Sequence, residues 1–142
     1  MLQALTMGFQ FPASLTPDFR ITLQEGERRW NVHCSGILDA PNAAALLQPE
    51  LLRLHAAAIE ARIPVVGLAL ESVEYINSSG LKSFMAWFLA AANESDFRYT
   101  IEVTYDTSRS WQQLSLKPME RLAPRTVKLV ARTAPGTKTT ND

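Results

Sequence analysis

The sequence predicts an α/β fold: one domain with a mixed β-sheet that is flanked by helices and opens with a β-hairpin. Strand-like and helix-like segments alternate after the first two strands, as they do in α/β proteins. The 142 residues suffice for one compact domain but not for two ordinary ones. Hydrophobic residues make up 46% of the chain and charged residues 20%, a composition typical of globular proteins.

The opening hairpin is predicted from two alternating segments around a turn. Apolar and polar side chains alternate from Phe19 to Leu23, the pattern of a half-buried strand. A Glu-Gly-Glu turn follows at residues 25–27, and residues 29–35 resume the alternation. We expect these two strands to pair with each other.

Residues 43–61 then favour a helix that Pro49 interrupts. Proline lacks the N–H group that a helix interior needs and is best tolerated in the first turn. We therefore expect the main helix to begin near Pro49, with residues 43–47 as a separate turn or a kinked lead-in.

The most informative stretch runs from residue 65 to residue 92. The apolar run from Val65 to Leu70 is typical of a buried strand in a sheet that is covered on both faces. From Leu81 to Ala92, apolar side chains recur at helical spacing. Between the two lie a short loop and then the sequence Asn-Ser-Ser-Gly-Leu at residues 77–81.

Ser78 and Ser79 stand where this helix should begin. A serine hydroxyl there can accept a hydrogen bond from a free first-turn N–H group and so cap the helix. The same N–H groups and the positive end of the helix dipole would stabilise a phosphate on the hydroxyl. Two interpretations follow: a plain helix cap, or a cap that is also a phosphorylation switch.

The remaining segments complete the alternation. We expect a strand at residues 97–105, a short helix at 108–116, a further helical turn at 119–122 and an edge strand at 127–130. Small and polar residues prevail in the last segment of the chain, which predicts a disordered tail at residues 132–142.

The charge balance and the residue inventory argue against several classes of protein. Fourteen basic and fourteen acidic residues cancel, whereas a nucleic-acid or anionic-membrane binder should be basic. No apolar run is long enough to span a membrane, and the N-terminus lacks the basic start of a secretory signal.

Cys34 is the single cysteine, so a reducing, cytoplasmic location is expected. His33 and His55 belong to no cluster with metal-ligand spacing, so we expect no metal and no cofactor.

Two motifs in this order of elements resemble the STAS family, the domain that anti-sigma factor antagonists share with sulfate transporters. One is Gly-Ile-Leu-Asp at residues 36–39, before the first helix. The other is Val-Glu-Tyr-Ile-Asn-Ser-Ser-Gly-Leu at residues 73–81, between the buried strand and the amphipathic helix. The resemblance implies an N-terminal segment at residues 1–16, a STAS-like domain at 17–131 and the tail at 132–142.

The resemblance to the antagonist branch implies a bacterial, cytoplasmic, non-enzymatic switch protein. Its partners would be a serine/threonine kinase of the histidine-kinase-like ATPase class and a metal-dependent serine phosphatase, and neither nucleic acid nor membrane insertion would be involved. The phosphoacceptor of the family is the first serine of the motif, which is Ser78 here. The unmodified form would bind its target, and the phosphorylated form would release it.

Asn77 departs from the family pattern, which usually has Asp at this position. An amide is neutral and can only hydrogen-bond, so phosphorylation could be slower or absent. The same change removes one negative charge beside a phosphate and so reduces repulsion. The sequence is compatible with both consequences.

The partner surface expected around the phosphoacceptor consists of Asn77, Ser79, Gly80, Leu81, Lys82, Trp87 and Asp39. Trp87 lies outside the apolar stripe of its helix, so we expect it to be partly exposed, as a packed flank or a binding anchor. Gly80 would allow a partner's backbone to approach, or would ease the turn. Asp39 would cap the first helix or contact the partner.

Two other functions stand as alternatives. A constitutive scaffold, as STAS relatives in transport complexes suggest, would dock a partner through the Ser78 loop without phosphate. A serine hydrolase would need His33 or His55 beside Ser78, and the sequence has no Gly-x-Ser-x-Gly elbow.

Basic residues predominate from Arg109 to Lys138, which indicates a solvated face or a contact for an acidic partner.

Overall fold

The computed structural model describes residues 9–132, which form five strands and three helices. The strands are β1 (Phe19–Glu25), β2 (Arg29–Leu38), β3 (Val65–Ile76), β4 (Thr100–Asp106) and β5 (Val127–Arg132). The helices are α1 (Ala43–Ala61), α2 (Ser78–Ala92) and α3 (Ser110–Leu122). The predicted tail, apart from Arg132, and the first half of the predicted N-terminal segment lie outside the described residues.

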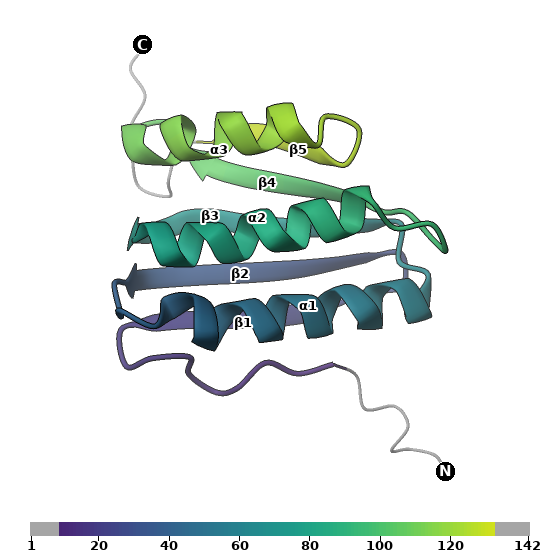
Figure 1. Cartoon of the computed structure of the whole chain (residues 1–142), viewed down its shortest axis with the longest axis horizontal. Coiled ribbons are helices and arrows are strands. Elements are labelled where there is room, and N and C mark those ends of the chain that lie inside the picture. The colour runs from purple at the N-terminus through teal and green to yellow at the C-terminus, as the bar shows by residue number, and fades with distance from the viewer. Residues whose placement is uncertain (1–8, 133–142) are drawn as a thin grey trace.

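The sheet is mixed, and its strands follow one another in the order β1-β2-β3-β4-β5. β1 and β2 form the predicted antiparallel hairpin, with Ile21 opposite Cys34, and the other three neighbouring pairs are parallel. Each parallel connection passes through one helix. Because such crossovers are right-handed, all three helices lie on the same face of the sheet (Figure 1). The predicted fold class is confirmed.

The hydrophobic core lies between this face and the helices. The strand side chains that point toward the helices are buried, namely Phe19, Ile21, Val32, Cys34, Val66, Leu68, Leu70, Ile101 and Val103. The prediction that β3 is covered on both faces is wrong, because all three helices of residues 9–132 lie on one face. On the other face β3 presents Gly67 and Ala69, and the Arg29 side chain reaches over Gly67. Two small residues thus extend the apolar run of β3 without leaving large apolar side chains in water.

β3 extends further than predicted and continues to Ile76, without the expected loop. β2 extends as well, so that Leu38 pairs with Ile76, although the register shifts twice along this pair. β3 and β4 pair only as far as Ala69 and Thr104. Gln112 of α3 fills the space beyond, where the two strands separate. Its Nε2 donates to the carbonyls of Leu70 (2.8 Å) and Val73 (2.9 Å), and its Oε1 accepts from the N–H of Asp106 (2.8 Å).

α1 and α3 each run unbroken through a proline, which corrects the predicted breaks at residues 47–49 and 116–119. The buried stripe of α1 continues from Leu47 to Leu51 across Pro49, and the prolines themselves are exposed. Each proline frees the carbonyl four residues before it, at Ala45 and Leu114, and both of those residues are exposed to water. Packing of the apolar stripe therefore outweighs the one hydrogen bond that each helix loses.

Candidate functional site

The candidate site lies at the carboxyl edge of the sheet, where β3 ends and α2 begins with Ser78. The side chain of Ser78 is exposed, and within residues 9–132 its hydroxyl has no hydrogen-bond partner. As the first residue of α2, Ser78 lies beside the N–H groups of the first turn and at the positive end of the helix dipole. The hydroxyl is therefore both accessible and placed where a negative charge is tolerated.

Asn77, not a serine, is the cap of α2. Its Oδ1 accepts a hydrogen bond from the N–H of Gly80 at 2.8 Å, and its Nδ2 donates to the carbonyl of Ala40 at 2.9 Å. The first contact caps α2, and the second ties α2 to the loop before α1. An aspartate could make only the first, because a carboxylate has no N–H to donate. The residue that departs from the family pattern thus has a structural role that the usual Asp could not fill.

Ser79 caps the neighbouring helix. Its Oγ accepts a hydrogen bond from the N–H of Ala44, in the first turn of α1, at 2.9 Å. The N-cap residue of α1 itself, Asn42, makes no side-chain cap bond. The two adjacent serines therefore differ: among the described residues the hydroxyl of Ser78 has no partner, whereas that of Ser79 is half-buried and engaged.

Gly80 allows α2 to pack closely on the sheet. A Cβ atom at this position would lie 2.6 Å from Cγ2 of Ile76 and 2.9 Å from Cδ2 of Leu38. Gly80 is buried beneath the first turn of α2, so the expectation that it meets a partner is wrong.

Charged side chains of both signs flank Ser78. Lys82 lies one turn further along α2 and is exposed, while Leu81 is half-buried. Asp39 is also exposed, and it follows Leu38, whose carbonyl accepts from the N–H of Asn77 at 2.9 Å. Asp39 does not cap α1, because that helix begins only after Asn42.

Trp87 does not belong to this surface, which corrects the predicted exposure. Its side chain is fully buried, and its Nε1–H donates to the hydroxyl of Tyr99 at 2.8 Å. The same hydroxyl lies 2.7 Å from Nδ1 of His55, and Nε2 of His55 lies 3.2 Å from Oε1 of Glu94. Burial raises the pKa of Tyr99 well above its ordinary value. Ser83 and Ala91, one turn to either side of Trp87, are also buried, and this row of small residues was the signal for a wider buried stripe.

Tyr75 was missed as a candidate. It is 49% exposed three residues before Ser78, and its ring centroid lies 6.5 Å from that of Trp111 at the start of α3. This pair lies at the same carboxyl edge of the sheet as Ser78. It therefore takes the place of Trp87 as the aromatic part of the candidate surface.

Neither histidine is placed to activate Ser78. Both ring nitrogens of His55 are engaged by Tyr99 and Glu94, and His33 projects from the face of the sheet opposite to the helices. Within residues 9–132, no three His, Cys, Asp or Glu side chains are grouped so that they could hold a metal ion. In the same part of the chain, no helix has the length and apolar character needed to cross a membrane.

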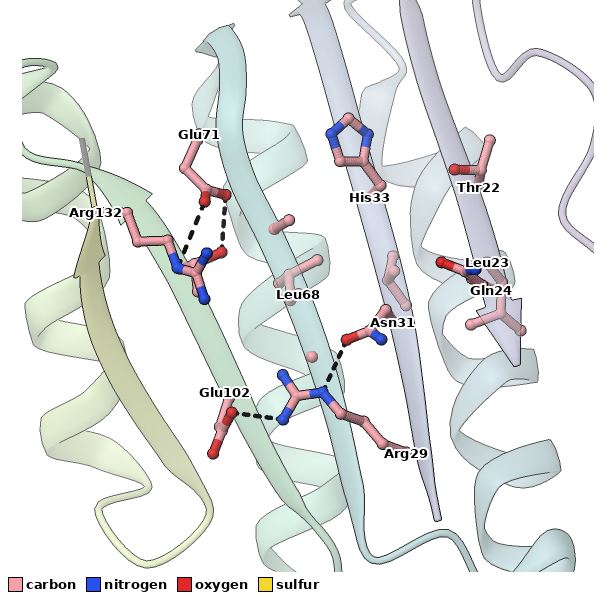
Figure 2. A pocket seen from close by; sticks show the side chains of 14 residues that line it. Thr22, Leu23, Gln24, Arg29, Asn31, His33, Leu68, Glu71, Glu102 and Arg132 are labelled. Atoms are coloured by element: carbon pink, nitrogen blue, oxygen red, sulfur yellow. Dashed lines mark hydrogen bonds and ion pairs between the residues drawn. The ribbon is translucent and has the colours of Figure 1, made fainter. Parts of the chain in front are cut away.

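A second polar surface lies on the open face of the sheet, around a hollow of about 320 Å³. Figure 2 shows Arg29 reaching from β2 across β3 to Glu102 on β4, with 2.7 Å between Nη1 and Oε1. On the other side of the hollow, Nε of Arg132 lies 3.9 Å from Oε2 of Glu71. The charged groups of the hollow are thus paired with one another. They form a cross-strand network over the bare centre of β3.

The fold defined by these elements is that of a STAS domain. Eight chains among the solved structures match it. One is the crystal structure of an anti-sigma factor antagonist from Mycobacterium paratuberculosis, which is 18% identical in sequence and has a TM-score of 0.53. The alignment covers 80% of this chain and 88% of the other. No family model and no curated protein matches the sequence. The resemblance inferred from the two motifs is confirmed at the level of the fold.

Proposed function

We propose that this protein is a non-enzymatic regulator of the STAS type, whose binding to a partner protein is controlled by phosphorylation of Ser78. The observation that carries the proposal is the contrast between two adjacent hydroxyls. Ser78 is exposed and, within residues 9–132, unbonded, whereas Ser79 is engaged by the N–H of Ala44. A kinase would reach Ser78 without opening the fold. The similarity in fold to an anti-sigma factor antagonist supports the antagonist branch.

Phosphorylation would change the charge of this surface while preserving the fold. A phosphoserine carries about −1.5 to −2 charges at neutral pH, and the N-terminus of α2 would favour it by roughly 0.3–1 kcal/mol. Lys82, at i+4 on the same helix, is placed to pair with it. A partner that covers Ser78 would have to desolvate the phosphate. Burial of an unpaired charge costs several kcal/mol, and each 1.4 kcal/mol is about tenfold in affinity, so a release of about 100-fold is expected.

The proposed partners follow from the antagonist branch. They are a serine/threonine kinase of the histidine-kinase-like ATPase class and a metal-dependent serine phosphatase, both cytoplasmic. The proposed contact surface is Ser78 with Asp39, Lys82 and Tyr75, which are exposed around it. Leu81 and Asn77 support this surface from below, being half-buried.

Asn77 favours a second candidate, a constitutive scaffold that binds its partner without phosphorylation. The position carries an uncharged side chain that is occupied on both sides by the main chain of Gly80 and Ala40. Position 77 therefore supplies no carboxylate that could help a kinase orient the hydroxyl of Ser78.

The test compares tagged variants in the native cells. Intact-mass and peptide mass spectrometry should find a phosphate on Ser78, and Ser78→Ala should abolish it. Ser78→Asp should reduce the amount of co-purifying partner at least tenfold relative to Ser78→Ala. Ser95→Asp places the same charge at another exposed serine and should leave that amount unchanged.

Far-UV circular dichroism of Ser78→Asp should match that of the unmodified protein. If partner recovery is equal for Ser78→Asp and Ser78→Ala, and no phosphate is present, the scaffold replaces the switch. A variant that unfolds on gaining one charge at Ser78 would contradict the proposed tolerance of the helix terminus.

A further inference from the structure

The outer side of α3 exposes a row of apolar side chains. Leu114, Pro118 and Leu122 are spaced four residues apart and therefore lie along one side of the helix. Leu114 is 74% exposed and Leu122 is 60% exposed, the two highest values among the large hydrophobic residues of the described chain. Single exposed leucines are ordinary on protein surfaces, but an aligned row on one helix is a contiguous apolar strip.

A row of basic side chains runs beside the apolar one. Lys117 and Arg121 are exposed and four residues apart, so two like charges face each other across one helical turn. Within residues 9–132, neither has a carboxylate at ion-pair distance. By contrast, Arg29, Arg53 and Arg62 each pair with an acidic side chain. The two rows, Leu114-Pro118-Leu122 and Lys117-Arg121, make up the α3 outer surface.

The charge of the whole chain is unevenly distributed, and its C-terminal part is basic. Residues 107–142 contain seven basic and two acidic residues, whereas residues 1–106 contain seven basic and twelve acidic ones. The zero net charge thus conceals a positive C-terminal quarter. Within that quarter, Glu120 is occupied by a hydrogen bond from the N–H of Leu129 at 3.2 Å.

The α3 outer surface is also hollowed. A shallow depression of about 470 Å³ lies along it, lined by Ser110, Gln113, Leu114, Lys117, Pro118 and Arg121. Apolar and basic groups therefore border the same groove. On the open face of the sheet, in contrast, the charges are already paired with one another.

We propose that the α3 outer surface docks an acidic amphipathic helix of a partner protein. The apolar row of that helix packs against Leu114, Pro118 and Leu122, and its carboxylates pair with Lys117 and Arg121. The strip from residue 114 to residue 122 is about 12 Å long, which matches a little over two turns of a partner helix. Nucleic acid is a poorer match, because the strip offers two cations and aliphatic side chains in place of aromatic stacking surfaces.

This contact is separate from the proposed Ser78 switch. Ser78 begins α2, whereas the α3 outer surface belongs to another helix and is directed to solvent. Ser78→Asp should therefore leave it unchanged, so that failure of one proposal does not decide the other.

The test uses the full chain and a synthetic helical peptide of 14 residues, with a Leu row at four-residue spacing and a Glu row beside it. Binding is followed by fluorescence anisotropy and by ¹⁵N chemical shifts. We expect shift changes at residues 110–122 and weaker binding as salt rises, since exposed charges are screened. Lys117→Glu or Arg121→Glu should weaken binding roughly fivefold or more. Each substitution removes one exposed ion pair and puts a repulsion between like charges in its place.

Arg28→Glu is the matched control, because Arg28 is exposed in the turn between β1 and β2 and the charge change is the same. It should change affinity less than about twofold. Lys117→Gln and Arg121→Gln remove the charge without reversing it, so they should weaken peptide binding less. They provide the test if a charge reversal perturbs the helix. The proposal is overturned by a peptide that does not bind, by equal binding of a peptide with Lys in place of Glu, or by equal affinities of the α3 variants and Arg28→Glu. Binding to phosphatidylglycerol vesicles without binding to the peptide would overturn it in favour of a membrane surface.

Discussion

Asn77→Asp tests whether the departure from the family pattern is structural. The substitution keeps the cap bond from the N–H of Gly80 and removes the donation from Nδ2 to the carbonyl of Ala40. It also places a carboxylate oxygen against that carbonyl. Leaving a half-buried acceptor unpaired costs about 1–3 kcal/mol, while a negative charge at the N-terminus of α2 returns about 0.3–1 kcal/mol. We expect a net loss of roughly 1–2 kcal/mol in the free energy of unfolding.

Urea unfolding followed by circular dichroism measures this loss, and the slope of the transition should not change. Asn77→Ala removes the cap as well and should lose more than Asn77→Asp. Asn42→Asp is the matched control: it is the same substitution at the N-cap of α1, where the side chain makes no cap bond. Its stability should be unchanged or slightly raised. A stability of Asn77→Asp equal to that of the unmodified protein, or an equal loss in Asn42→Asp, would refute the reasoning.

Three further outcomes follow from buried side chains. Gln112→Leu should lower the free energy of unfolding, measured in urea, by about 3–5 kcal/mol, because it leaves the polar groups of β3 and β4 unpaired. Gln113→Leu is the control at a position with no such bonds, and it should change the free energy of unfolding little. Tyr99→Phe should cost about 1–3 kcal/mol in thermal unfolding, because Trp87 loses its acceptor. Tyr105→Phe is the control, and an equal cost there would argue against the network. Cys34 is fully buried and its pKa is raised by burial, so at pH 8 a disulfide reagent should modify it only after denaturation; modification at the rate of a free thiol would contradict this.

The sequence was sufficient where a residue's position follows from periodicity alone. The alternation in β1 shows which of its side chains leave water, and burial is what periodicity measures. Pro49 misled the prediction because propensity counts the hydrogen bond that is lost but not the packing of the stripe on both sides of the proline.

The roles at the candidate site depended on contacts between distant segments. Nothing local distinguishes the hydroxyl of Ser79 from that of Ser78, since the difference comes from the N–H of Ala44, 35 residues away. Likewise, in the sequence Gln112 looks like any polar residue of a short helix. Its role arises because β3 and β4 separate beside it in the fold. Trp87 was misplaced for a simpler reason: a central helix with a neighbour on each side buries more of its circumference than a surface helix does.

The agreement between strand order and chain order has a consequence for how the molecule assembles. Each parallel strand joins the edge left by the strand before it, with one helix between them, so every pairing in the sheet can form as soon as its segment is available. Such an order of assembly suits a chain that emerges progressively during synthesis. Until residues 127–132 arrive, β4 remains an unprotected edge. A truncation before residue 127 should therefore promote aggregation through that strand.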